Sequence, residues 1–237
     1  MVKFSSKAPG IGKYDPQTIM DNQTPTTINY HITLLRHAQS QGNFEGRHQG
    51  QADFPLTDLG RQQTNALVDR WKAEKKEIDL VISSPLARAR ETAEIIASEL
   101  RLPLELDPLW MERDNGLMAG LSPEEVRETL PHSDFIHPYQ PIGQTGESQW
   151  ELYLRAGSAV QSLLNHPPGC YLIVSHGGLL NMFFYAILGI APQPNFHGPR
   201  FRFNNTAFAT LHYNPASHRW YILGVNDSRH WKSEAGE

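Results

Sequence analysis

Short apolar runs alternate with longer amphipathic stretches along most of the chain. The apolar runs predict strands over residues 30–35, 80–83, 104–106, 171–174, 207–213 and 220–225. Apolar residues at helical spacing predict helices over residues 57–76, 85–100, 149–164 and 179–188, and another helix begins at Ser122. Strands that alternate with helices favour one α/β domain with a mainly parallel sheet.

Two stretches lack this periodicity. Residues 1–28 are rich in Lys, Ser, Pro, Gly, Gln and Thr and predict an extended N-terminal arm, so residues 29–237 are expected to form a single domain. Residues 131–146 contain several prolines and glycines and predict an irregular excursion. Its Phe135, Tyr139 and Ile142 offer apolar surface that could cover an apolar or aromatic ester, as could Trp150.

Composition narrows the class of protein. The 237 residues are 39% hydrophobic and 19% charged, which suits a globular domain with a substantial core. A net charge of −4 argues against general binding to nucleic acid or to an anionic membrane. No apolar run approaches the ~20 residues that span a bilayer, and the first residues lack the apolar core of a secretory signal, so the cytoplasm is the expected compartment.

Cys170, the one cysteine, begins an apolar run and is expected to be buried rather than nucleophilic.

Cationic and polar residues follow three of the predicted strands. Arg36 and His37 follow the first, Arg88 lies shortly after the second, and His176 with two glycines follows residues 171–174. The carboxyl ends of parallel strands lie at one edge of a sheet, so these groups are expected to meet. Arginines, histidines and helix N-termini in one place suit a tetrahedral dianion such as phosphate. Taken alone, Arg36 could instead pair with a surface carboxylate, and His37 could be an ordinary polar residue at a strand end.

One acid can join this group. Phosphoryl transfer needs a nucleophile, positive charge and an acid for the leaving oxygen. Glu112 lies in a glycine-containing loop that could approach the same sheet edge. The alternative for Glu112 is a surface position beside Arg113 and Asp114.

These motifs, in this order, resemble the histidine phosphatase superfamily, also called phosphoglycerate mutase-like. The resemblance runs from about His31 to Trp231. It rests on Arg36-His37-Ala38 with Ser40 and Asn43, on residues 55–60, on residues 84–93, on Glu112 with Gly116 and Gly120, on His176-Gly177-Gly178, and on the tail at residues 225–231. Two positions depart from the family pattern, because Ala38 replaces the usual glycine and Met118 stands where tryptophan is usual.

The resemblance implies a three-layer α/β/α sandwich with a mainly parallel central sheet, and it implies a role for each motif residue. His37 is expected to attack phosphorus and become phosphohistidine, and Glu112 to protonate the leaving alcohol and then activate water. The other expected catalytic residues, which bind the phosphoryl oxygens, are Arg36, Arg88 and His176, and the expected substrate-binding residues are Asn43, Gln49 and Gly177. No metal and no cofactor are implied, because cationic side chains neutralise the phosphate charge.

Several residues near these motifs keep two interpretations. Arg47, Gln49 and Arg113 either contact substrate or lie at the surface. The remaining histidines are scattered over loops and the tail, and solvated or structural roles are expected for them because no two form a metal-ligand pair on a helix face.

The sequence favours a phosphatase whose partner is a small-molecule phosphomonoester. The alternative is a phosphoglycerate mutase, which by resemblance carries a longer, more basic insertion before the second histidine. Here residues 121–175 contain only Arg127 and Arg155 as basic residues besides histidine. A non-catalytic phospho-ligand binding module is a weaker alternative, because every catalytic position is filled. The particular substrate stays open, and so does assembly into a homo-oligomer.

Overall fold

One six-stranded sheet organises the part of the chain that the computed structural model describes, residues 29–131 and 134–231. The predicted arm, residues 1–28, lies outside it. The strands are β1 (Tyr30–Arg36), β2 (Leu80–Ser83), β3 (Leu104–Leu106), β4 (Cys170–Ser175), β5 (Phe208–Asn214) and β6 (Arg219–Asp227). Their spatial order is β3-β2-β4-β1-β5-β6. The first four run parallel, β5 is antiparallel to β1, and β6 is antiparallel to β5.

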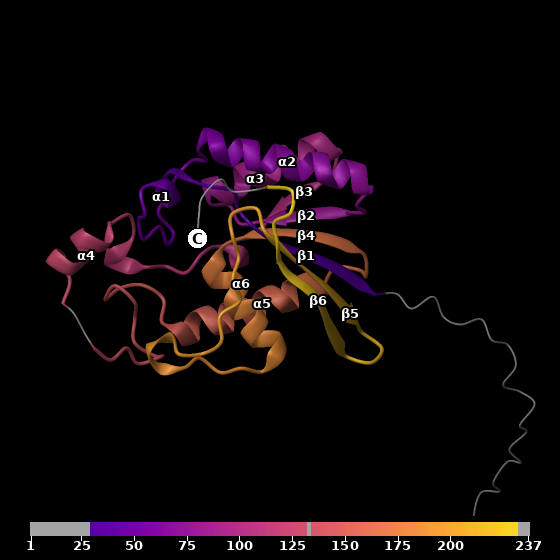
Figure 1. The fold of residues 1–237 in the computed structure, drawn as a ribbon. Coiled ribbons are helices and arrows are strands. Elements are labelled where there is room, and N and C mark those ends of the chain that lie inside the picture. The colour runs from indigo at the N-terminus through magenta and orange to yellow at the C-terminus, as the bar shows by residue number, and fades with distance from the viewer. Residues whose placement is uncertain (1–28, 132–133, 232–237) are drawn as a thin grey trace, which may run out of the picture.

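Helices cover both faces of this sheet (Figure 1). The α-helices are α1 (Gln41–Phe44), α2 (Asp58–Glu74), α3 (Ala87–Leu100), α4 (Pro123–Thr129), α5 (Gln149–Leu164) and α6 (Gly177–Leu188), and short 3₁₀ turns are η2 (Pro108–Trp110), η3 (Gly116–Met118) and η4 (Pro194–Phe196). Helices α2 and α3 lie on one face, and α5 and α6 lie on the other (Figure 1). The predicted three-layer α/β/α sandwich is therefore confirmed.

The two apolar layers follow from the alternation of side chains along buried strands. Leu34 packs in the core under α5 and α6, whereas its neighbour Leu35 packs under α2 and α3. Both are fully buried, as are Trp71 on one side and Phe183 on the other. Burial of one such side chain stabilises the fold by about 1.5–3 kcal/mol.

Local signals place several helices where the sequence predicts them. Ser148 caps α5, and the side chain of Glu151 accepts from the Ser148 backbone N–H, which completes a capping box. Ser122 and Glu125 form the same box at the start of α4. Two starts differ from the prediction. Helix α3 begins two residues after Pro85, at Ala87, and α6 begins at its first glycine, two residues before the predicted start.

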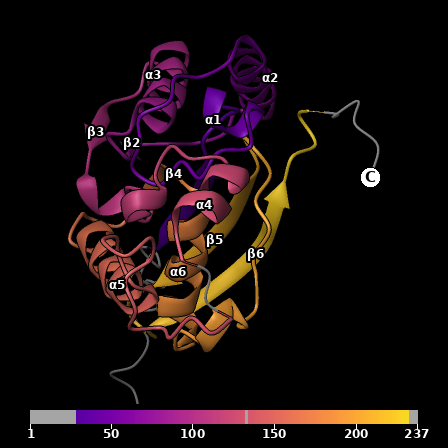
Figure 2. The same ribbon diagram turned by 90° about the vertical axis from the view of Figure 1, so that its left-hand side faces the viewer.

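Strand register brings the predicted motifs to one edge of the sheet. Arg36 pairs with Ser175 across β1 and β4, and Ser83 pairs with Val174 across β2 and β4, so these three strands end almost level. Helices α1 and α4 lie at this edge, on the left of Figure 1 and toward the viewer in Figure 2. Helix α1 is not among the helices that the sequence predicts, and Ser40 caps it by accepting from the Asn43 N–H.

Cys170 also differs from its prediction. It is half-buried rather than buried, because it is the first residue of β4 and lies at the opposite end of the strand from the motifs. Burial and the neighbouring Asp79 and Glu77 raise the pKa of its thiol, which opposes formation of a nucleophilic thiolate.

Candidate active site

A buried cationic cluster forms where β1, β2 and β4 end. His37, Arg88 and His176 are 2%, 1% and 0% exposed, although polar side chains of this kind are seldom so buried. The rings of His37 and His176 are tilted, with centroids 5.0 Å apart. Arg36 adds its charge at the end of β1 and lowers the pKa of both histidines. The two arginines and two histidines predicted from three separate motifs therefore lie together.

The hydrogen bonds of His37 determine its tautomer. Its Nδ1 lies 2.7 Å from the Ala38 carbonyl oxygen, which can only accept, so Nδ1 carries the proton. On the other side of the ring, Arg88 Nε donates to Nε2 at 3.3 Å. The Nε2 lone pair of a neutral imidazole therefore faces the cationic cluster. Support comes from α3, where Thr92 Oγ1 accepts from the Ala38 N–H at 3.1 Å.

Positive charge and burial keep both histidines neutral. Burial lowers the pKa of His37 well below its usual range, and Arg88 and Arg36 lower it further, against the hydrogen bond to Ala38. Burial, Arg88, His37 and Arg36 act in the same direction on the pKa of His176. Burial also lowers the pKa of Arg88 to about 10, with Glu112 and Asp53 opposing it, so this guanidinium stays charged at neutral pH.

Two nitrogen atoms in the cluster have no hydrogen-bond partner among the described residues. These are Arg36 Nε and His176 Nδ1, both buried. Other atoms of these side chains are engaged, since Arg36 Nη1 donates to the Phe203 carbonyl at 2.7 Å and His176 Nε2 lies 2.8 Å from Ser84 Oγ. Buried polar atoms in folded proteins are nearly always paired. Because Ser84 Oγ already accepts from the Leu86 N–H, its own proton can be donated to His176 Nε2, which places the proton of neutral His176 on Nδ1. Both orphaned atoms are then donors, and they point to a ligand with acceptor oxygens.

Glu112 lies against the start of α6. Its Oε2 accepts from the Gly178 N–H at 3.0 Å, and its Oε1 accepts from the N–H groups of Leu179 at 3.1 Å and Arg113 at 2.9 Å. A side chain at Gly178 would collide with Oε1, so only glycine permits this approach. Of about four acceptor positions on a carboxylate, three are used and the free one is on Oε2.

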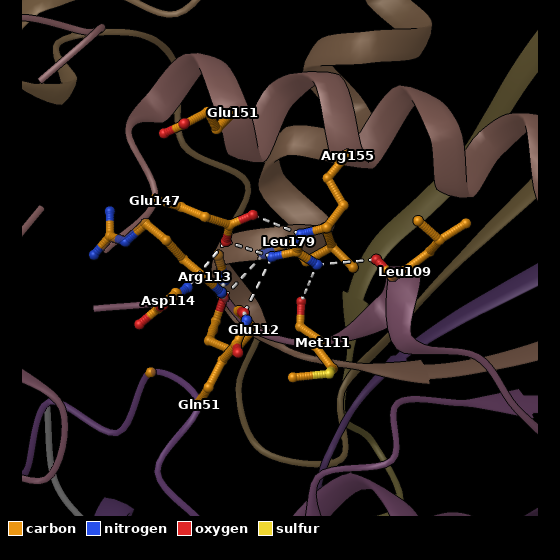
Figure 3. A network of polar contacts seen from close by, with 12 residues as sticks. Gln51, Leu109, Met111, Glu112, Arg113, Asp114, Glu147, Glu151, Arg155 and Leu179 are labelled. Atoms are coloured by element: carbon orange, nitrogen blue, oxygen red, sulfur yellow. Dashed lines mark hydrogen bonds and ion pairs between the residues drawn. The ribbon is translucent and has the colours of Figure 1, made fainter. Parts of the chain in front are cut away.

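A network of polar contacts centred on Arg155 holds the loop that carries Glu112 in place (Figure 3). Arg155 on α5 binds both carboxylate oxygens of Glu147 at 2.7 Å. The same guanidinium donates to the backbone carbonyls of Leu109, Met111 and Glu112 at 3.0, 2.6 and 3.1 Å. Arg155 therefore acts on Glu112 through the backbone. Figure 3 also shows the guanidinium of Arg113 directed away from this network.

The predicted substrate-binding residues lie in two environments. Gly177 begins α6, and a Cβ there would lie 3.9 Å from Arg36 Nε, so its backbone borders the cluster. Asn43 is linked to the cluster by Asn205, whose Nδ2 donates to the Asn43 Oδ1 at 3.1 Å and to the His37 carbonyl at 3.0 Å. Gln49 instead accepts from Ser40 Oγ at 2.6 Å and braces the loop that carries Asn43.

The two departures from the family pattern have simple structural consequences. Ala38 is fully buried and is not among the residues with positive φ, so a methyl group replaces hydrogen without backbone strain. Met118 packs near Gly143, where a Cβ would lie 3.0 Å from the methionine Cγ. Gly116, at φ +53°, sits so close to the backbone of Gly146 that no side chain fits.

Sequence reasoning missed two members of the site. Ser84 follows β2 at the same sheet edge, and the strand-end argument that selects His37 and His176 would have selected it too. Asn205 carries no comparable signal, because it reaches Asn43 from 162 positions away. The sequence leaves Arg47 as either a substrate contact or a surface residue. In the structure its guanidinium donates to Glu45, Glu125 and the Gly120 carbonyl.

In the described part of the chain, no three or more His, Cys, Asp or Glu side chains are grouped so that they could hold a metal ion. None of the helices over these residues is both long and apolar enough to cross a membrane.

Comparison with known proteins agrees with this geometry. The model of a family described as the histidine phosphatase superfamily (branch 1) matches residues 32–228. A Cronobacter sakazakii protein named probable phosphoglycerate mutase GpmB is 34% identical over 215 residues, which cover 86% of this chain and 96% of the relative. The solved structure of Bacillus stearothermophilus YhfR matches with a TM-score of 0.74 and 29% identity, over 85% of this chain and 98% of that one. A mycobacterial glucosyl-3-phosphoglycerate phosphatase shares the fold, with a TM-score of 0.68 and 24% identity over 84% of this chain and 99% of that one.

Proposed function

The chain belongs to the histidine phosphatase superfamily, and we propose that it is a phosphomonoester hydrolase that acts on small phosphorylated metabolites through a phosphohistidine intermediate. The observation that carries this proposal is the pair of orphaned buried nitrogens, Arg36 Nε and His176 Nδ1, beside the neutral Nε2 of His37. A phosphoryl group would supply acceptors for both nitrogens while its phosphorus lies next to a nucleophile.

The proposed reaction has two displacements at phosphorus. In the first, the Nε2 lone pair of His37 forms a bond to phosphorus, the ester P–O bond breaks, and the leaving oxygen takes a proton from Glu112. In the second, water attacks phosphorus, gives a proton to Glu112, and the P–N pair returns to His37. Arg36, Arg88 and His176 neutralise the phosphoryl oxygens throughout, so the proposal requires no metal ion.

One feature permits hydrolysis, and a second favours it over the mutase reaction. Glu112 Oε2 keeps a free acceptor position that can orient water for the second step. The cavity beside the cluster is lined largely by apolar and aromatic side chains, among them Leu152, Phe201 and Phe203. Phosphoglycerate is small and polar throughout, so it would leave most of this surface uncovered. The relatives named as probable mutases make the alternative worth testing directly.

Trapping the intermediate tests the proposal. After a rapid quench with labelled substrate, the wild type should carry a phosphoryl group that survives alkali and is lost in acid, as a phosphoramidate is. His37→Ala should carry none, whereas Arg90→Met on the exposed face of α3 should label like the wild type. Label that persists in His37→Ala would contradict the assignment. Efficient interconversion of 2- and 3-phosphoglycerate, in excess of phosphate release from monoesters, would establish the mutase instead.

A further inference from the structure

A cavity of about 630 Å³ opens beside α6, next to the cationic cluster. Gly177 and Gly178 line it, and these glycines also border Arg36 and Glu112. A molecule in this cavity can therefore reach the groups proposed to handle phosphate. We call it the alcohol pocket, and its other main lining residues are Arg113, Gln149, Met182, Phe196, Phe201 and Phe203.

The outer wall of the alcohol pocket is fixed in place. Asn181 on α6 donates to the Phe201 carbonyl at 2.9 Å and accepts from the Phe201 N–H at 2.8 Å. The hydroxyl of Tyr185 donates to the Pro199 carbonyl at 2.9 Å. The Phe203 carbonyl is held by Arg36 itself. The wall is thus tied both to α6 and to the cationic cluster, which gives the pocket a defined shape.

The aromatic residues that line the pocket differ from those that the sequence suggests. The aromatic residues of the 131–146 excursion are expected to cover an ester, but Phe135 and Tyr139 are 54% and 62% exposed, and Tyr139 stacks on Trp150 at 5.2 Å. None of these side chains lines the alcohol pocket. The aromatic surface comes instead from residues 196–203, whose position beside α6 depends on tertiary contacts.

Arg113 and Gln149 line the pocket and carry donor groups that have no acceptor of their own among the described residues. Gln149 is 2% exposed, and its Nε2 has no partner among the described residues. Arg113 donates through Nε to Asn115 Oδ1 at 3.0 Å and lies 5.2 Å over the Phe196 ring. In the described part of the chain it forms no ion pair, so its two terminal nitrogens remain available. Burial lowers the pKa of Arg113, with Glu112 and Glu147 opposing the shift.

We propose that the alcohol pocket binds the alcohol part of the substrate, and that this alcohol carries a flat apolar group ending in a carboxylate. The apolar group would pack between Met182 and the phenylalanines, and the carboxylate would accept from Arg113 and Gln149. The terminal nitrogens of Arg113 and Nε2 of Gln149 are unpaired donors among the described residues, and a carboxylate would supply acceptors for them. The exposed Arg200 and Arg202 at the rim favour the same charge. This inference rests on the proposed phosphatase function and goes further by naming the substrate class.

A matched pair of esters tests the substrate class. Benzyl phosphate and 4-carboxybenzyl phosphate have closely similar leaving groups and differ in the carboxylate, so a difference in kcat/KM reports binding of that group. We expect kcat/KM to be at least about tenfold higher for the carboxylated ester, since a hydrogen bond to a charged group is typically worth that factor or more. A ratio near one in an active enzyme would overturn the substrate class and leave the hydrolase proposal standing.

Variants from two different elements locate the effect. Arg113→Met and Gln149→Leu should each bring the ratio of the two kcat/KM values toward one, mainly through KM for the carboxylated ester. Arg90→Met, on the opposite face of the sheet, should leave the ratio unchanged. Gln149→Leu should also keep the melting temperature, because the lost N–H has no partner within the protein. Equal losses of kcat/KM for both esters in both variants would contradict the proposed contact between the carboxylate and these two side chains.

Binding without turnover separates this inference from the proposed function. Calorimetry should show tighter binding of 4-carboxybenzylphosphonate than of benzylphosphonate, with the preference reduced in Arg113→Met. This result would support the pocket even if no ester were hydrolysed. A failure to hydrolyse any ester would instead contradict the proposed hydrolase function. Equal affinities for the two phosphonates would overturn the pocket assignment.

Discussion

At the scale of single residues, the site depends on one neutral histidine surrounded by cations. A protonated His37 would have no lone pair at Nε2 and could not attack phosphorus. The Ala38 carbonyl fixes the proton on Nδ1, and Arg88 and Arg36 make a second proton unfavourable. The same charges that are proposed to bind the phosphate dianion therefore keep the proposed nucleophile neutral.

The protonation state of His37 can be measured directly. Its pKa is held well below the usual value near 6.5, so the ring should stay neutral over the pH range in which a free histidine titrates. Nitrogen NMR of the free protein should show a protonated Nδ1 and an unprotonated Nε2 across this range. A titration midpoint near pH 6.5, assigned by comparison with His37→Asn, would contradict the electrostatic argument.

The role of Glu112 can be separated into its two proposed steps. General acid catalysis is typically worth about 10²–10⁴-fold, and it matters most for a poor leaving group. Glu112→Gln should slow formation of phosphohistidine strongly for an alkyl ester and weakly for a nitrophenyl ester. Attack by water should slow for both, so the nitrophenyl ester should give a fast burst and a slow steady state. Equal slowing of the burst for both esters would make Asp114 the next candidate acid.

At the scale of elements, local and tertiary signals explain which predictions succeed. Helix α5 has its predicted limits, because Ser148 caps it and its apolar residues keep one period. The early start of α6 has no local signal, since glycine is a poor helix former. The N–H groups of that first turn are satisfied by Glu112, which lies more than 60 residues earlier in the chain.

The loop that carries Glu112 depends on α5 through Arg155. In Arg155→Met, the carbonyls of Leu109 and Met111 lose a charged donor. The Glu112 carbonyl keeps Gln51 Nε2 as a donor, and Glu147, which is mostly buried like Arg155, keeps the Asp114 N–H. We expect a loss of about 3 kcal/mol in the free energy of unfolding, measured by urea denaturation. The kcat of this variant for alkyl esters should also fall, because the Glu112 backbone loses its hydrogen bond from Arg155. Arg127→Met, which breaks an exposed pair with Glu124 on α4, should cost less than about 1 kcal/mol.

At the scale of the whole molecule, parallel strand order is what makes the site predictable from sequence. His37 and His176 lie far apart in the chain, yet both follow strands whose carboxyl ends must meet at one edge. Contacts made by side chains across loops follow no such rule. Asn205, the Arg155 network and the aromatic wall at residues 196–203 come together only in the folded chain, so the sequence alone leaves them out.

The burial of neutral histidines should make the whole fold sensitive to acid. His37 and His176 have folded pKa values well below the unfolded value near 6.5, and burial lowers the pKa of His230 to about 4. Below pH 6.5 the unfolded chain therefore binds protons that the folded chain does not. The free energy of unfolding should consequently decrease as the pH is lowered. The expected slope is about 1.4 kcal/mol per pH unit for each such histidine.

Urea denaturation at pH 5, 6, 7 and 8 measures this dependence. Stability should be nearly constant from pH 8 to 7 and should decline steeply from pH 6 to 5. The Asp227 carboxylate does not confuse this window, because its pKa is lowered by Arg70 and its ion pair is lost only in stronger acid. His37→Gln removes one buried imidazole, so the slope between pH 6 and 5 should fall by about 1.4 kcal/mol per pH unit. An unchanged slope in this variant would mean that the folded protein already protonates His37 in that range, and the proposed nucleophile would then be inactive there.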